Sequence, residues 1–204
     1  LVMTISLKLK WIKSDLENKT FLLLFFVISI FFSIFIIKSL NVDFLINTVL
    51  LASAFYLFLI TLKDFFIKKI ENLSQNLSHF GFSLLILSIL FNNFFTTEII
   101  TNLKIGESFQ TKNLKVIFED ISHKEESNFK SIIGKFKIES TDGTIEVLNP
   151  ELRIYNQPSI VTSEADIKTS LIADKFMTMN LVQNQEYFNI RYQFKPLMIW
   201  IWLS

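Results

Sequence analysis

Three long stretches without a charged side chain dominate the first half of this 204-residue chain. They cover residues 20–37, 44–62 and 72–97, and the third is polar at both of its ends. A helix of about 18 residues rises about 27 Å, which is close to the thickness of the hydrocarbon layer of a bilayer. We therefore expect three membrane-spanning helices, at residues 20–37, 44–62 and 77–95.

The rest of the chain has a different character. Half of all residues are hydrophobic, yet residues 96–195 have the mixed polarity of a water-soluble domain. Residues 196–204 are apolar again but too short to span, and Trp200 and Trp202 suit the interfacial end of a helix. The sequence thus predicts a membrane α-helical protein, with three spans plus the start of a fourth, truncated span, and a small β-rich domain inserted before it.

Basic residues in the short flanks set the expected orientation. Residues 1–19 and the segment after the second span are basic, whereas the loop after the first span carries only Lys38. The basic flanks are expected in the cytoplasm, so residues 96–195 would lie in the periplasm or at the cell exterior. A signal peptide is a poor alternative for the first span, because the next two need the same bilayer. The basic residues are Lys8, Lys10, Lys13, Lys63, Lys68 and Lys69.

Alternation of apolar and polar residues is the main pattern between the third and fourth spans. Asp142-Gly143 is the clearest hairpin signal, and a short helix is expected over residues 163–173, capped by Thr162 or Ser163. The pattern favours a small sandwich or open barrel. The expected strands are 114–121, 132–138, 144–148, 152–155, 176–181 and 188–194.

Composition excludes several classes of function. A net charge of +1 gives no reason to expect nucleic acid as a partner. Without cysteine the sequence has no disulfide, no thiolate metal site and no C-x-x-C-H motif for haem attachment. Four glycines leave little scope for a phosphate-binding loop. His123 lies in a polar run and is interpreted as a solvated loop residue, and no group of residues suggests a catalytic site.

His79 is the candidate functional residue of the sequence, because it lies well inside the third uncharged stretch. Ionisable groups at such depth usually face a bundle interior or a cavity and mark a ligand or proton site. A neutral imidazole is also a good axial ligand for haem iron. Two other interpretations stay open, a hydrogen bond to a neighbouring helix and a position at the membrane interface. Gly81, two residues on, would allow close approach of a helix or a flat ring.

Several motifs follow one another between residues 78 and 204. They are SHFGFSLLILSILFNNFFTTE, LKIGESF, LKVIFEDI, LNPELRIYNQPSIVTSEADIKTSLIADKFM and IRYQFKPLMIWIWLS. In this order they resemble one known family, the CcmF-type cytochrome c haem lyases. The residues before 78 match that family only in helix spacing and charge. The resemblance also implies a bacterial inner membrane, with residues 96–195 in the periplasm.

The resemblance implies a role in the assembly of c-type cytochromes. It implies that His79 is one of two axial ligands of a membrane-embedded b-type haem, with the second ligand outside this sequence. The expected partners are membrane lipid, a haem chaperone, apocytochrome c and other cytochrome c maturation subunits. It also implies that the family's Trp-rich outer loop and its other functional histidines precede residue 1, so the chain would be one component of the lyase.

Two other interpretations of the sequence compete with the haem lyase. The first is a membrane-anchored outer module that only binds partners, with His79 structural. The second, half of a transporter, is disfavoured because the spans lack paired Gly or Pro interruptions and further charges. No catalytic role is expected for four residues in the resembling motifs, which could simply brace the domain. They are Arg153, Tyr155, Glu164 and Arg191.

Overall fold

The computed structural model describes residues 19–40, 42–67, 73–182 and 186–204. The chain divides into two compact units. The first contains the residues up to Phe94 together with Leu197–Ser204, and the second is Phe95–Pro196. Five of the lysines used for the predicted orientation lie outside the described residues, namely Lys8, Lys10, Lys13, Lys68 and Lys69.

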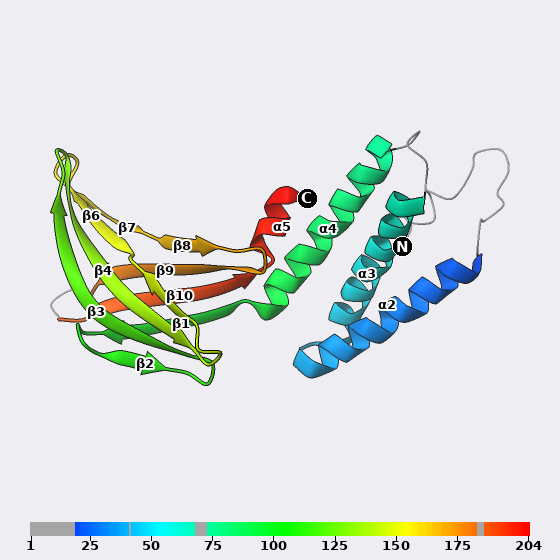
Figure 1. Ribbon diagram of the computed structural model, residues 1–204, viewed down its shortest axis with the longest axis horizontal. Coiled ribbons are helices and arrows are strands. Elements are labelled where there is room, and N and C mark those ends of the chain that lie inside the picture. The colour runs from blue at the N-terminus through cyan, green and yellow to red at the C-terminus, as the bar shows by residue number, and fades with distance from the viewer. Residues whose placement is uncertain (1–18, 41, 68–72, 183–185) are drawn as a thin grey trace. The chain divides into compact units, whose positions relative to one another are not determined.

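Three helices of the first unit are long and apolar enough to cross a membrane. They are α2 (Lys19–Leu40), α3 (Phe44–Ile67) and α4 (Leu73–Phe95), and Figure 1 shows their order. The prediction of three spanning helices is confirmed at the level of the fold. Helices α3 and α4 extend beyond the uncharged cores expected from the sequence, because polar residues continue a helix wherever its backbone bonds are still made.

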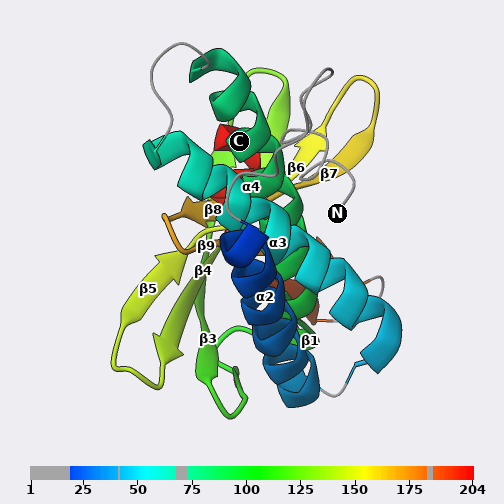
Figure 2. The same ribbon diagram turned by 90° about the vertical axis from the view of Figure 1, so that its right-hand side faces the viewer.

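Small residues let α2 and α3 pack closely, and the two helices lie side by side in Figure 2. Ser29 and Ser33 are buried, and each hydroxyl donates to the carbonyl one turn earlier, at 2.7 Å. Phe26 meets Tyr56 of α3 edge to face, with ring centroids 5.6 Å apart. The two hydroxyls therefore form their hydrogen bonds within α2, and side-chain packing holds α2 and α3 together.

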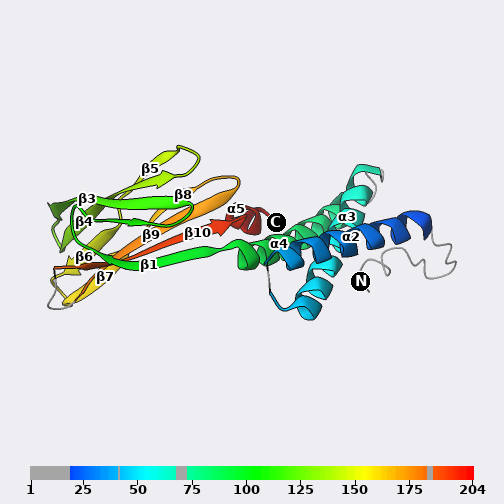
Figure 3. The same ribbon diagram turned by 90° about the horizontal axis from the view of Figure 1, so that it is seen from below.

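The second unit is a sandwich of two antiparallel sheets (Figures 1 and 3). One sheet has the order β1-β10-β9-β8, and the other has the order β2-β3-β4-β6-β7 with β5 paired to β4. The sandwich alternative is thus confirmed and the open barrel is not. The strands are β1 (Thr97–Leu103), β2 (Ser108–Gln110), β3 (Leu114–Glu125), β4 (Phe129–Ser140), β5 (Ile145–Leu148), β6 (Glu151–Tyr155), β7 (Ile160–Glu164), β8 (Asp166–Thr169), β9 (Ala173–Leu181) and β10 (Phe188–Pro196).

The core of the sandwich is built by the alternation that predicted the strands. Phe118 of β3 and Phe136 of β4 are fully buried and stacked, with ring centroids 4.3 Å apart. Phe188 of β10 meets Phe118 edge to face from the other sheet, at 5.5 Å. Met177 and Met179 of β9 complete the contact between the two sheets.

The prediction of a helix over residues 163–173 is wrong. Strand β7 covers the start of this segment and strand β8 its middle. The Ser163 hydroxyl, expected to cap a helix, instead donates to the Met179 carbonyl of the facing sheet at 2.7 Å. Pairing with β6 and β9 satisfies the backbone of this segment, and such tertiary contacts override a weak local preference.

The chain leaves the sandwich by a sharp change of direction. Leu197 follows β10 in the left-handed conformation, with φ 55°, and the short helix α5 (Met198–Leu203) begins there. Few residues other than glycine adopt this conformation freely. The start of a helix after the domain is therefore present where the sequence placed it.

Gly134 of β4 offers a test of this core. A Cβ at this position would lie 2.6 Å from Cε2 of Phe136 and 2.8 Å from Sδ of Met179, both of which are fully buried. We expect Gly134→Ala to lower the free energy of unfolding by about 1–3 kcal/mol through overpacking. Unfolding of the protein in detergent, followed by the β-sheet circular dichroism signal, measures the change.

Lys135→Ala is the matched control, because the neighbouring Lys135 lies on the opposite face of β4 and makes only a surface ion pair with Glu119. Its effect should stay within about 1 kcal/mol. Equal stability of Gly134→Ala and the parent protein would contradict the close packing described here.

Candidate functional site

The structure places His79 on the face of α4 that turns toward α3. His79 is half-buried and lies one helical turn before Ser83, which is fully buried. Residues four apart share a helix face, so the two side chains point in similar directions. The seventh residue of α4 is about 9 Å along the axis from the helix start. His79 therefore lies inside the helix, near the contact with α3.

Aromatic side chains of α3 pack against Phe80, the residue after His79 in α4. Phe80 stacks on Phe65 of α3, with ring centroids 5.6 Å apart, and contacts Phe58 at 5.7 Å. Further along, Phe55 of α3 meets Phe91 of α4 edge to face at 5.9 Å. These rings make the region between the two helices apolar and fix the rotation of α4 about its own axis.

A buried pair of hydroxyls joins the same two helices. Thr61 Oγ1 of α3 and Ser83 Oγ of α4 are 2.9 Å apart, and both residues are almost completely buried. One of the two hydroxyls donates its proton to the other, and the second donates to a carbonyl of its own helix; Thr61 Oγ1 lies 2.9 Å from the Leu57 carbonyl oxygen, and Ser83 Oγ lies 2.7 Å from the Phe80 carbonyl oxygen. The pair sets the register of α4 against α3 one turn away from His79.

Asp64 is a buried residue that sequence reasoning missed. Its side chain is 6 % exposed, and it follows Thr61 by three residues, which places both on one face of α3. The second span is predicted over residues 44–62, which leaves this carboxylate outside it. The spacing of Thr61 and Asp64 is the signal that could have found it, since polar residues three apart on an apolar helix share one side.

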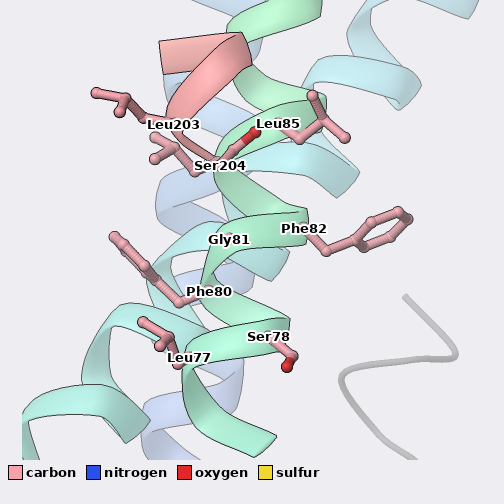
Figure 4. Close-up of a pocket in the computed structure, with 9 residues that line it drawn as sticks. Leu77, Ser78, Phe80, Gly81, Phe82, Leu85, Leu203 and Ser204 are labelled. Atoms are coloured by element: carbon pink, nitrogen blue, oxygen red, sulfur yellow. The ribbon is translucent and has the colours of Figure 1, made fainter. Parts of the chain in front are cut away.

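A pocket of about 530 Å³ lies on a different side of α4 (Figure 4). Its walls are mostly apolar and come from α4 and from the end of α5. Gly81 lines it, and a Cβ there would lie 3.3 Å from the carbonyl carbon of Ser204. His79 is not among the residues that line it, and its side chain points about 200° away from the position of Gly81 around the helix axis. Gly81 thus faces α5 and cannot flank a ring bound at His79.

The described residues fit one side of a haem site. Among them, no group of three His, Cys, Asp or Glu side chains could hold a bare metal ion. Haem iron needs only one or two axial protein ligands, and a neutral imidazole is a common one. In the part of the chain that the structure describes, the His79 imidazole makes no hydrogen bond or ion pair. None of the described residues therefore competes with a ligand for this imidazole.

The remaining motif residues lie in the sandwich. His123 is exposed, as expected, but it belongs to strand β3 rather than to a loop. Arg153 of β6 donates to both carboxylate oxygens of Glu151 at 3.1 Å and lies 5.1 Å from the ring centre of Phe129. Glu164 accepts a hydrogen bond from Thr162 at 3.1 Å. These contacts brace the outer face of one sheet and assemble no catalytic group.

A second polar cluster joins β1 and β10. Glu98 accepts hydrogen bonds from Arg191 and, at 3.0 Å, from the amide of Gln193. The guanidinium of Arg191, followed by the Gln193 amide, lowers the pKa of the Glu98 carboxyl from its ordinary value of 4.5. The cluster lies on the first and the last strand of the sandwich, which follow α4 and precede α5 in the chain. It therefore supports the end of the sandwich at which the chain enters and leaves.

A family model described as the CcmF C-terminal beta-sandwich matches residues 94–196. The match takes in half of the chain, from the end of α4 to the end of β10. The chain belongs to the CcmF family.

Named relatives agree with this membership. The chain is 27% identical over 130 residues to the cytochrome c-type biogenesis protein CcmF of Pseudomonas fluorescens, covering 64% of this chain and 20% of the relative. It is 28% identical over 130 residues to CcmF of Haemophilus influenzae, covering 63% and 20%. NrfE of the same organism, also a cytochrome c-type biogenesis protein, is 22% identical over 155 residues, covering 76% and 24%. The chain thus spans about a fifth of the length of its CcmF relatives.

A solved structure titled Cytochrome c Heme Lyase CcmF has the same fold as this chain. The TM-score is 0.68 at 17% sequence identity, and the likeness covers 99% of this chain and 35% of that one. Apolar helices followed by a β-sandwich are therefore the architecture of this part of the CcmF fold.

The Thr61–Ser83 contact predicts a measurable coupling between α3 and α4. We expect a double-mutant cycle of Thr61→Val and Ser83→Ala to give a coupling of about 0.6 kcal/mol, typical of hydrogen bonds between membrane helices. Equilibrium unfolding in bicelles measures it. A cycle of Ser29→Ala with Ser83→Ala should show none, because the Ser29 hydroxyl bonds within its own helix. A zero coupling for the first pair would contradict the contact.

The Glu98 cluster predicts a loss of stability in acid. A carboxyl with a lowered pKa stabilises the fold above the pKa of the unfolded chain and loses this contribution as pH falls through the folded pKa. The sandwich should thus lose stability below pH 4.5, and Glu98→Gln should lose less. Arg191→Gln should weaken the same pH dependence by removing the main cause. Thermal melting as a function of pH measures it, and an unchanged acid slope in Glu98→Gln would disprove the role of this carboxyl.

Proposed function

We propose that this chain is the C-terminal part of the haem lyase subunit of cytochrome c maturation, and that His79 is an axial ligand of a b-type haem within the membrane. Membership in the CcmF family and the names of the relatives support the general role in cytochrome c biogenesis. The single observation that carries the haem assignment is the His79 imidazole on α4, half-buried and without a hydrogen bond among the described residues.

The surroundings of His79 suit axial ligation better than a solvated role. A buried ionisable group is costly in a membrane unless it binds something or meets a polar partner. The nearby aromatic rings of Phe58, Phe65 and Phe80 offer an apolar wall. Burial of this kind also raises the strength of a ligand bond by excluding water that competes for the iron. His79 would hold the iron on one side, with the second axial ligand supplied from outside this sequence.

A bound haem b supplies reversible one-electron chemistry, which would keep the iron of an incoming haem reduced. The chain's own residues would do the positioning. The Thr61–Ser83 pair and the rings between α3 and α4 hold the face of α4 on which His79 lies. No residue of the sandwich receives a catalytic role in this proposal.

The sandwich is proposed to lie in the periplasm of a bacterial inner membrane, as the basic flanks of the sequence indicate. There it would contribute to docking of a haem chaperone, apocytochrome c and other maturation subunits. Covalent attachment of haem to apocytochrome c would occur on this side.

The test uses the purified complete protein, in which the segment that supplies the second axial ligand is present. It compares the haem spectra of the parent sequence, His79→Ala and His123→Ala, each expressed to the same level. We expect the reduced-minus-oxidised b-type signal to be lost or shifted in His79→Ala, because an axial ligand is removed. His123→Ala is the matched control, since His123 is the second histidine of the sequence and lies exposed on β3. Its spectrum should equal that of the parent protein.

An unchanged b-type signal in His79→Ala would show that His79 is not a required ligand. Restoration of the signal in His79→Gly by added imidazole would separate ligation from a folding defect. A parent protein without haem would favour the rival function, a membrane-anchored scaffold that only binds partners.

A further inference from the structure

The turn between β8 and β9 carries two adjacent apolar side chains that the sandwich core does not use. Leu171 is 66% exposed and Ile172 is 74% exposed. Ile167, on the preceding strand, is also half exposed at 51%. Two other turns of the sandwich are polar, with Asp142-Gly143 between β4 and β5 and Asn156-Gln157 between β6 and β7. The turn between β1 and β2 exposes a single apolar side chain, Ile105 at 52%. Two adjacent exposed apolar side chains thus distinguish the β8–β9 turn from these three.

The register of the sheet shows which end of the sandwich carries this tip. Ala173, the first residue of β9, pairs with Pro196, the last residue of β10, so residues 170–172 extend past the end of β10. Thr97, the first residue of β1, pairs with Phe194 at the same end. Figure 1 shows the β8–β9 turn at the end of the sheet where β10 ends.

Chain connectivity ties this end of the sheet to the membrane. Helix α4, long and apolar enough to span, ends at Phe95, two residues before Thr97. Two residues reach at most about 7 Å. Strand β9 is separated from β1 only by β10, and neighbouring strands lie about 4.8 Å apart. Within the sandwich, the tip therefore lies at the end where the chain enters from α4 and leaves for α5.

The backbone of the turn suits an environment with little water. The Ser170 amide donates to the Ala173 carbonyl at 3.2 Å, and the Ser170 hydroxyl donates to the same carbonyl at 2.7 Å. The hydroxyl oxygen in turn accepts from the amides of Ile172 and Ala173, at 3.3 and 3.1 Å. Polar backbone groups are costly in an apolar medium unless they are bonded internally. Ser170 removes most of that cost for this turn.

We propose that Leu171 and Ile172 insert into the outer leaflet of the bilayer and anchor the sandwich to the lipid surface. The hairpin acts as a second attachment point beside the strands that continue into α4 and α5. It limits the tilt of the sandwich against the membrane, since a domain tied through one pair of adjacent strands could otherwise rock about them. Lys168 is the basic residue between Asp166 and Asp174, so charge does not favour contact with anionic headgroups and the apolar side chains of the tip would carry the insertion.

The sequence contains no cysteine, so single thiols can be introduced without removing native ones. Ile172→Cys is labelled with an environment-sensitive fluorophore, and the protein is reconstituted in vesicles of phosphatidylethanolamine and phosphatidylglycerol. Leu171→Cys is a second test position in case one label disturbs the turn. Asn156→Cys is the control, because this exposed residue lies in the polar β6–β7 turn, at the opposite end of the sandwich in Figure 1.

We expect blue-shifted emission at position 172, quenching by doxyl-labelled lipid and protection from aqueous iodide, with the reverse at position 156. Quenching of position 172 by iodide and not by lipid would overturn the proposal. Protection from both quenchers would also overturn it, because the tip would then be covered by protein. None of these outcomes depends on haem binding. The experiment therefore tests lipid insertion independently of the proposed function.

Discussion

The antiparallel pairing of β1 with β10 is the contact on which the architecture depends. These strands are the first and the last of the sandwich, and they pair over seven residues, from Thr97 opposite Phe194 to Leu103 opposite Phe188. Because they are neighbours, the chain leaves α4 and returns to α5 at adjacent points. A domain of about a hundred residues can then be inserted between α4 and α5 with its two ends side by side. Polar contacts at Glu98 and between Asn102 and Asn189 secure the pair.

The two units are stabilised by different physical means. The sandwich removes aromatic and aliphatic side chains from water, with Phe118 and Phe136 at its centre. Helices that lie in lipid gain little from that effect, so close packing and a few polar contacts hold them together. The Thr61–Ser83 pair and the stacked Phe65 and Phe80 provide both between α3 and α4. The orientation of His79 is a consequence of that packing.

The sequence predicted helices and strands correctly where a hydrophobic pattern extends over many residues. Three uncharged runs gave the three long helices, and alternation gave most strands of the sandwich, including β3, β4 and β10. It failed where distant pairing decides the structure. Strand β1 was not expected, although it pairs along its whole length with β10, and the polar segment around Ser163 was interpreted as a helix. The partner of β1 lies about ninety residues away in the sequence, and local alternation does not show such a pairing.

The sequence alone determined that the chain has spanning helices, a β-rich insert and one histidine inside a span. Those features depend on hydrophobicity and local period, which each segment carries in itself. Only the tertiary structure decided that His79 faces α3 while Gly81 faces α5, that Asp64 is buried, and that the tip at Leu171 lies at the base of the sandwich. These facts follow from the rotation of helices and the register of distant strands, and both are set by contacts between residues far apart in the chain.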